Sequence, residues 1–89
     1  MNRKRKDPSF EDFLQICKEA DSLLAQIRKF PKAQGRRPSN LKVALIHHLA
    51  WKKGINITLN HLYLIYGKHN FSIINSKKII RQILDNIQT

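Results

Sequence analysis

The chain has 89 residues, which is enough for one small domain, because a chain of this length buries only roughly 60 to 65% of its unfolded surface. Hydrophobic residues make up 42% of the sequence, so a core is expected and full disorder is excluded. A single cysteine excludes an internal disulfide and a Cys-x-x-Cys metal pair, and a net charge of +11 favours a polyanionic partner.

Residues 1–8 are expected to form a disordered basic arm, because Arg3, Lys4, Arg5 and Lys6 are consecutive cations without apolar residues to pack. This composition agrees with three roles: an arm that enters a groove of nucleic acid, a patch like those that direct nuclear import, or a start that only improves solubility. The segment that follows is amphipathic, so the pattern is not that of a signal peptide.

Residues 9–30 are predicted to form the first helix. Ser9 followed by Asp12 is a capping-box pattern, and Phe13, Cys17 and Ala20 begin a wide apolar face. We expect this face, over residues 10–30, to pack on the domain, with a homodimer or a protein partner as the alternative. Cys17 is expected to be a small buried hydrophobe.

Residues 31–40 contain two of the three prolines and are expected to be a surface loop, in which Arg36 and Arg37 contact phosphates. Ser39 is positioned to cap a helix over residues 40–53, which Gly54 ends.

Two more helices are predicted over residues 58–66 and 73–88. Thr58 caps the first of them, and Gly67 stands where a positive φ is required. Isoleucines from Ile73 onward form the apolar stripe of the second, and its opposite face is polar and basic. The expected fold is therefore all-α, with four helices in a single domain over residues 9–89.

The charge is unevenly distributed. Five of the six acids lie within residues 7–21, whereas residues 22–84 hold twelve Lys and Arg and no Asp or Glu. A stretch without acids cannot neutralise itself, so we expect a nucleic acid as its partner.

The sequence gives little sign of a metal site, a catalytic site or a membrane span. No two of the four histidines have an i, i+4 spacing, and after the first helix Asp85 is the only acid, so we expect no metal, no cofactor and no enzymatic activity. No apolar run approaches the roughly 18 residues that span a bilayer.

The last three predicted helices resemble a helix-turn-helix domain of the wingless winged-helix type. They are the helix over residues 40–53, then ITLNHLYLIYG, then SKKIIRQILDNI. The resemblance, over residues 40–88, implies that the last helix enters the major groove of DNA. The expected nucleic-acid-binding residues, from this resemblance and from the basic loop, are Arg36, Arg37, Lys42, Asn75, Ser76, Lys77, Lys78, Arg81 and Gln82, with the arm residues Arg3, Lys4, Arg5 and Lys6.

The sequence thus predicts a protein that binds double-stranded DNA, as a small transcriptional or replication regulator. It is expected to be cytoplasmic and nucleoid-associated, or nuclear in a eukaryote, without a membrane partner. A structured-RNA-binding module is the second choice. An antitoxin-like or inhibitor-like subunit that binds an acidic protein is the third.

Overall fold

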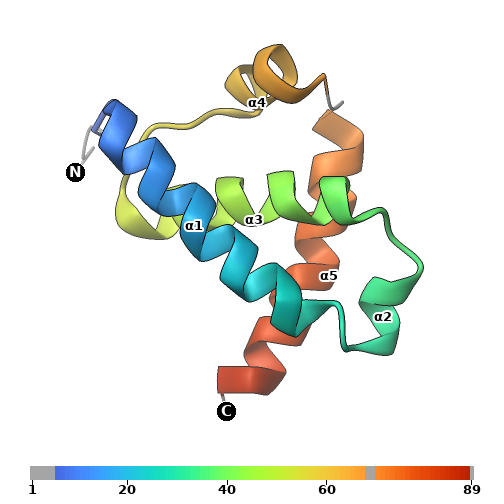
Figure 1. Cartoon of the computed structure of the whole chain (residues 1–89). Coiled ribbons are helices and arrows are strands. Elements are labelled where there is room, and N and C mark those ends of the chain that lie inside the picture. Colours follow the sequence, from blue (N-terminus) through green and yellow to red (C-terminus); the bar gives the residue numbers. More distant parts are fainter. Residues whose placement is uncertain (1–5, 68–69, 89) are drawn as a thin grey trace, which may run out of the picture.

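A computed structural model of the chain describes residues 6–67 and 70–88, without the side chains of residues 70, 71, 87 and 88. This part of the chain contains five helices (Figure 1), which are α1 (Phe10–Ile27), α2 (Pro31–Gln34), α3 (Pro38–Lys53), α4 (Leu59–Tyr66) and α5 (Asn70–Gln88). No β-strand occurs among these residues, apart from one isolated bridge. The expected all-α fold is confirmed, with one helix more than the four expected.

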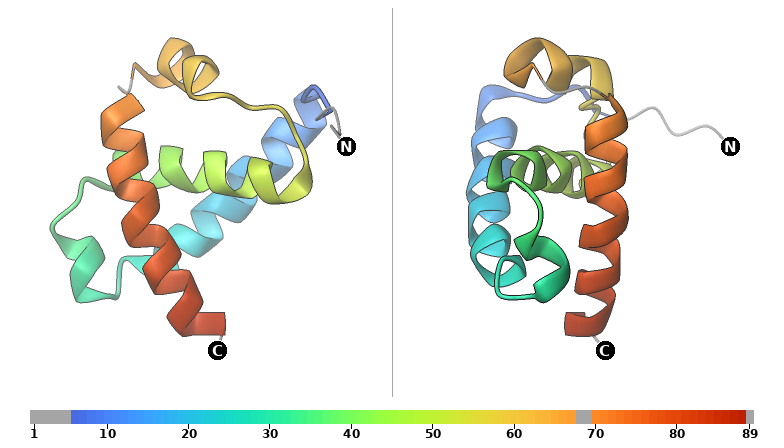
Figure 2. Two further views of the ribbon diagram at one scale, coloured as in Figure 1. Left: turned by 180° about the vertical axis from the view of Figure 1, so that it is seen from behind. Right: turned by 90° about the vertical axis from the view of Figure 1, so that its right-hand side faces the viewer.

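Helix α3 is the centre of the molecule. It contacts both α1 and α5 more extensively than these two helices contact each other. Seen along α3, α1 lies on one side of it and α5 on the other (Figure 2, right). Buried residues therefore occur all around α3: Leu41, Val43, Ala44, Leu45, Ile46, Leu49 and Ala50. A helix that is apolar on every side is stable only when it is enclosed by other elements.

Helix α1 begins at the predicted capping box. The Ser9 hydroxyl accepts a hydrogen bond from the Asp12 amide at 3.1 Å, and the Asp12 carboxylate accepts one from the Ser9 amide at 3.2 Å. These two hydrogen bonds, together with Lys6, lower the pKa of Asp12. The helix ends at Ile27 and not at residue 30, because Phe30 precedes a proline and adopts an extended conformation.

The expected loop over residues 31–40 is largely helical, which corrects the prediction. Pro31 and Pro38 each occupy the first turn of a helix, where the missing amide hydrogen costs nothing. Ala33 of α2 is buried in the core, so α2 is held by packing. Ser39 lies inside α3 and does not cap it, since the backbone of Arg37 takes the N-cap position.

Helix α4 has the predicted ends. Thr58 and His61 form a reciprocal capping box, and Gly67 ends the helix with φ of 70°. Tyr66 reaches α1, where its hydroxyl lies 4.0 Å from Sγ of Cys17. Burial, followed by the proximity of Cys17, raises the pKa of Tyr66 to about 12. Cys17 is half-buried here, and not fully buried as expected.

Helix α5 starts at Asn70, three residues before the predicted start. The prediction began at the first residue of the isoleucine stripe, Ile73, but Asn70, Phe71 and Ser72 before it belong to the same helix. At the other end of the described chain, the Lys6 amide donates to the Gly54 carbonyl at 2.9 Å, and its carbonyl accepts from the Asn56 amide. Lys6 therefore pairs with the α3–α4 link, whereas Arg3, Lys4 and Arg5 of the expected arm lie outside the described residues.

Candidate nucleic-acid interface

The outer face of α5 is the first of two exposed basic surfaces. Ile73, Ile80, Ile83 and Leu84 are buried at helical spacing. Lys78, Arg81 and Gln82, on the opposite side, are exposed, as predicted. We call these three residues, which lie within two turns, the α5 outer face.

Ser76 does not belong to this surface, although it was expected to contact DNA. Its side chain is fully buried, and its hydroxyl has no hydrogen-bond partner. Asn75 is half-buried. Because α5 begins at Asn70, residues 75–78 also lie beyond its first turn. Their backbone amides are therefore not among the unpaired amides at the start of the helix, which could bind a phosphate.

Lys77 is turned toward α3. Its ammonium lies 2.9 Å from Nδ1 of His47, and the side chain is half-buried. The neighbouring His48 is also half-buried between α3 and α5. Burial lowers the pKa of His48, and the nearby positive charges of Lys52, Lys77 and Arg81 lower it further, while Asp85 acts in the opposite direction.

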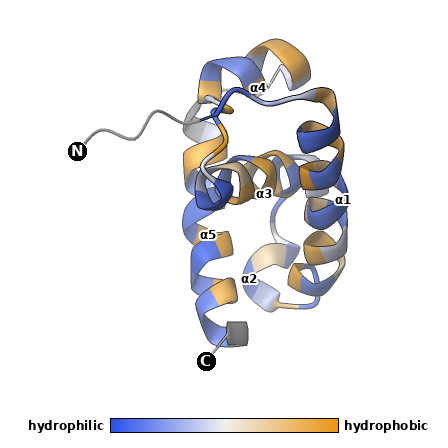
Figure 3. Ribbon diagram, turned by 90° about the vertical axis from the view of Figure 1, so that its left-hand side faces the viewer, coloured by the Kyte–Doolittle hydropathy of each residue, from blue (hydrophilic) through white to orange (hydrophobic). Residues whose placement is uncertain are grey.

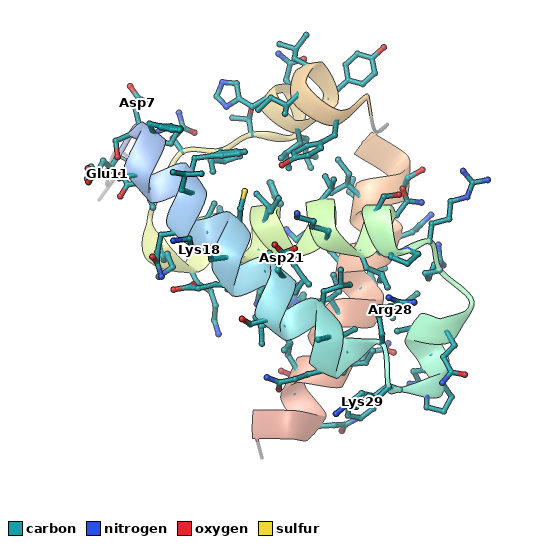
Figure 4. All side chains as sticks on the ribbon, in the orientation of Figure 1. Asp7, Glu11, Lys18, Asp21, Arg28 and Lys29 are labelled. Atoms are coloured by element: carbon teal, nitrogen blue, oxygen red, sulfur yellow. The ribbon has the colours of Figure 1, made fainter. Side chains whose placement is uncertain are left out.

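A second basic surface lies where α1, α2 and α3 meet. It consists of five exposed cations, which we call the basic corner: Arg28, Lys29, Lys32, Arg36 and Arg37. Arg28 and Arg36 line the same small hollow beside α2. Figure 4 shows Arg28 and Lys29 at the α2 end of α1, opposite the end that carries Asp7 and Glu11. Asp7 and Glu11 therefore lie at the other end of α1 from Arg28 and Lys29.

One side-chain contact joins the two surfaces. The Lys32 ammonium donates a hydrogen bond to Oε1 of Gln82 at 3.1 Å, and α2 packs on α5. Lys78 lies one turn before Gln82 on the same side of α5. Lys32 was not among the expected site residues, because only the packing of α2 on α5 brings it there. The density of cations in residues 28–42 was the available signal.

Lys42 is not part of either surface, which corrects another prediction. Its ammonium forms an ion pair with Asp21 of α1 at 3.0 Å, and Lys53 pairs with Glu19 at 3.1 Å. The acids of α1 thus neutralise cations of α3 that lack acids near them in sequence.

Exposed aromatic rings lie elsewhere. Among the described side chains, the exposed aromatics are Phe10 on α1, Trp51 at the end of α3 and Tyr63 on α4. None of them belongs to the basic corner or to the α5 outer face. Among the described side chains, the two basic surfaces therefore offer charge and hydrogen bonds but no exposed ring on which unpaired bases stack.

No group of three metal-ligating side chains gathers among the described residues, and none of the helices described is long and apolar enough to cross a bilayer. No family model, no curated protein and no solved structure matches the chain. What is established is therefore the class: a small all-α protein. The helix-turn-helix resemblance stays a prediction.

Proposed function

We propose that this protein binds nucleic acid, with double-stranded DNA as the preferred polymer, through the basic corner and the α5 outer face. The observation that carries the proposal is the contact between Lys32 and Gln82, which joins two exposed basic surfaces into one. Residues 22–84 contain no acid, and Asp85, exposed one turn beyond Arg81 on α5, borders this surface. Polyanions release counterions when such a surface binds them, and this release supplies affinity.

The residues have different roles in this proposal. Lys32, Arg36, Arg37 and Lys78 contact phosphates and fix the position of the duplex. Arg81 contacts base edges, because its guanidinium matches the two acceptors of guanine in the major groove. A helix of 19 residues, about 28 Å long, is narrow enough to lie along a groove about 12 Å wide.

Gln82 takes part only when it leaves Lys32. Its Oε1 accepts from the Lys32 ammonium in the free protein, whereas reading adenine requires both the oxygen and the nitrogen of the amide. We infer that a phosphate takes the place of Gln82 beside Lys32, which frees the amide for a base edge.

Duplex DNA is preferred over single strands because the exposed aromatic rings lie away from the basic surfaces. Structured RNA is the second polymer. The deep, narrow major groove of an RNA helix does not admit α5, so RNA would contact the basic corner alone. We propose that the protein uses this binding as a small regulator of transcription or replication.

The test is a mobility-shift titration with duplex DNA, structured RNA and single-stranded DNA of random sequence at one salt concentration. The double variant Lys78→Ala/Arg81→Ala is compared with Lys42→Ala/Lys53→Ala, which removes the same charge from the α1 side. We expect duplex DNA to bind most tightly and the first variant alone to lose affinity. Equal losses in both variants would mean that net charge, and not this surface, drives binding.

A further inference from the structure

An apolar surface remains exposed between the first half of α1 and α4. We call it the α1–α4 apolar face, and its residues are Pro8, Phe10, Phe13, Leu14, Cys17 and Ile65. Phe10, Leu14 and Ile65 are 70%, 47% and 59% exposed. Two shallow hollows that share Pro8 and Phe13 make the surface continuous. Figure 3 shows hydrophobic residues on α4 at the end of the molecule. Large side chains grouped in this way mark an interaction surface.

The rim of this face differs in charge from the rest of the molecule. Asp7 lines one of the hollows, and Glu11 and Asp12 stand on the same turn of α1 as Phe10. Two copies of a chain with a net charge of +11 repel each other unless they meet where the local charge is neutral or negative. Over the described residues 6–12 the charge is negative, because Lys6 stands against Asp7, Glu11 and Asp12, whereas the basic corner and α5 are positive.

The charges along α1 are arranged for pairing with a second α1. Glu11 and Lys18 are both exposed and lie seven residues apart, so they are on the same flank of the helix (Figure 4). The midpoint between them falls beside Leu14. A twofold axis through this midpoint, perpendicular to α1, brings Glu11 of each copy opposite Lys18 of the other.

We propose that a second copy of this chain docks on the α1–α4 apolar face, with the two α1 helices antiparallel and the axis beside Leu14. Leu14 then contacts its own counterpart, Phe10 is covered on each side, and two Glu11–Lys18 ion pairs flank the contact. The surface is self-complementary in both shape and charge.

The dimer keeps the α5 outer face accessible. Helix α3 lies between α1 and α5, so α1 can be covered while the α5 outer face remains open (Figure 2, right). The inference does not depend on nucleic-acid binding, and it is tested without any nucleic acid present.

The experiment measures the mass of the whole chain by sedimentation equilibrium over a range of concentrations in 0.15 M salt. The wild-type chain of 10.5 kDa is expected to reach twice that mass. Glu11→Lys alone and Lys18→Glu alone each place like charges opposite one another twice, and each is expected to weaken the dimer about tenfold or more. An equimolar mixture of these two variants is expected to form a heterodimer, because every pair is then of opposite charge. The exchanged double variant Glu11→Lys/Lys18→Glu is expected to dimerise as the wild type does.

Two controls complete the test. Lys52→Glu makes the same charge change as Lys18→Glu on the end of α3, and is expected to leave the dimer intact. Leu14→Asp replaces an exposed side chain, so it is expected to abolish the dimer while helicity by circular dichroism is unchanged. A wild-type chain that remains monomeric at millimolar concentration overturns the proposal. A dimer that neither single charge variant weakens also overturns it.

Discussion

The ammonium of Lys77 lies 2.9 Å from Nδ1 of His47 and links α5 to α3. An ammonium only donates hydrogen bonds, so the imidazole nitrogen accepts here, and the ring carries its proton on the other nitrogen. Two residues that are both positively charged at low pH thus form a contact that requires one of them to be neutral. The contact also fixes the direction of Lys77, which points toward α3 and away from the α5 outer face.

Lys77 and Lys78 are therefore expected to differ in nucleic-acid binding, although they are adjacent in sequence. Lys78→Ala should make the negative slope of log affinity against log salt shallower by about one, which is the effect of one lost phosphate contact. Lys77→Ala should change that slope by much less, because its ammonium is held by His47. Filter-binding titrations over a salt series compare the two. Equal slopes for both variants would show that Lys77 leaves His47 to bind.

His48 is expected to make the fold less stable in mild acid. Its pKa is lowered in the folded protein, by burial first and by Lys52, Lys77 and Arg81 next. The unfolded chain, with an ordinary value of about 6.5, therefore binds the proton more readily. The stability that this residue confers is present above pH 6.5 and is lost as the pH falls toward the folded pKa. Urea unfolding at pH 7.5 and 5.5 should show a smaller decrease for His48→Gln than for the wild type. If the decrease is the same in both, a different group causes it.

Local signals predicted the start of α1 and both ends of α4, but not the end of α1 or the starts of α3 and α5. Contacts between distant segments account for the errors in the predicted site. The capping boxes at Ser9 and Thr58 and the positive φ at Gly67 depend on neighbouring residues alone. The burial of Ser76 and the pairing of Lys42 with Asp21 depend on how α5 and α1 pack on α3. Helical spacing places a residue on a face, but it does not say how far a neighbouring helix covers that face.

Ser76 provides a direct check of this correction. Its hydroxyl is fully buried without a hydrogen-bond partner, so its desolvation is not compensated. Ser76→Ala is expected to leave the free energy of unfolding unchanged or to raise it by about 1 kcal/mol, since alanine also favours the helix. Nucleic-acid affinity should not change. Thermal and urea unfolding measure the change in stability. A variant that folds normally but binds nucleic acid more weakly would show that Ser76 belongs to the interface.

The three glycines are expected to respond differently to alanine. Gly54 and Gly67 have φ of 71° and 70°, which an alanine adopts at a cost of about 1 kcal/mol each. Gly35 has φ of −83° and open space around it, so Gly35→Ala serves as the matched control and should be neutral or stabilising by up to about 1 kcal/mol. The differences are measured as unfolding free energies in urea. A destabilised Gly35→Ala variant would mean that the turn after α2 needs a glycine for another reason.

Salt dependence is the most general consequence of the proposed binding surface. If Lys32, Arg36, Arg37 and Lys78 each neutralise one phosphate while Arg81 contacts a base, log affinity for duplex DNA falls with log salt at a slope of about −3.6. Affinity then decreases roughly 150-fold between 50 and 200 mM salt. Lys78→Ala/Arg81→Ala should reduce the slope to about −2.7, whereas Lys42→Ala/Lys53→Ala should retain the wild-type slope, because Asp21 and Glu19 already pair with those lysines. An affinity that does not vary with salt would contradict the electrostatic mechanism, because phosphate contacts cannot form without releasing counterions.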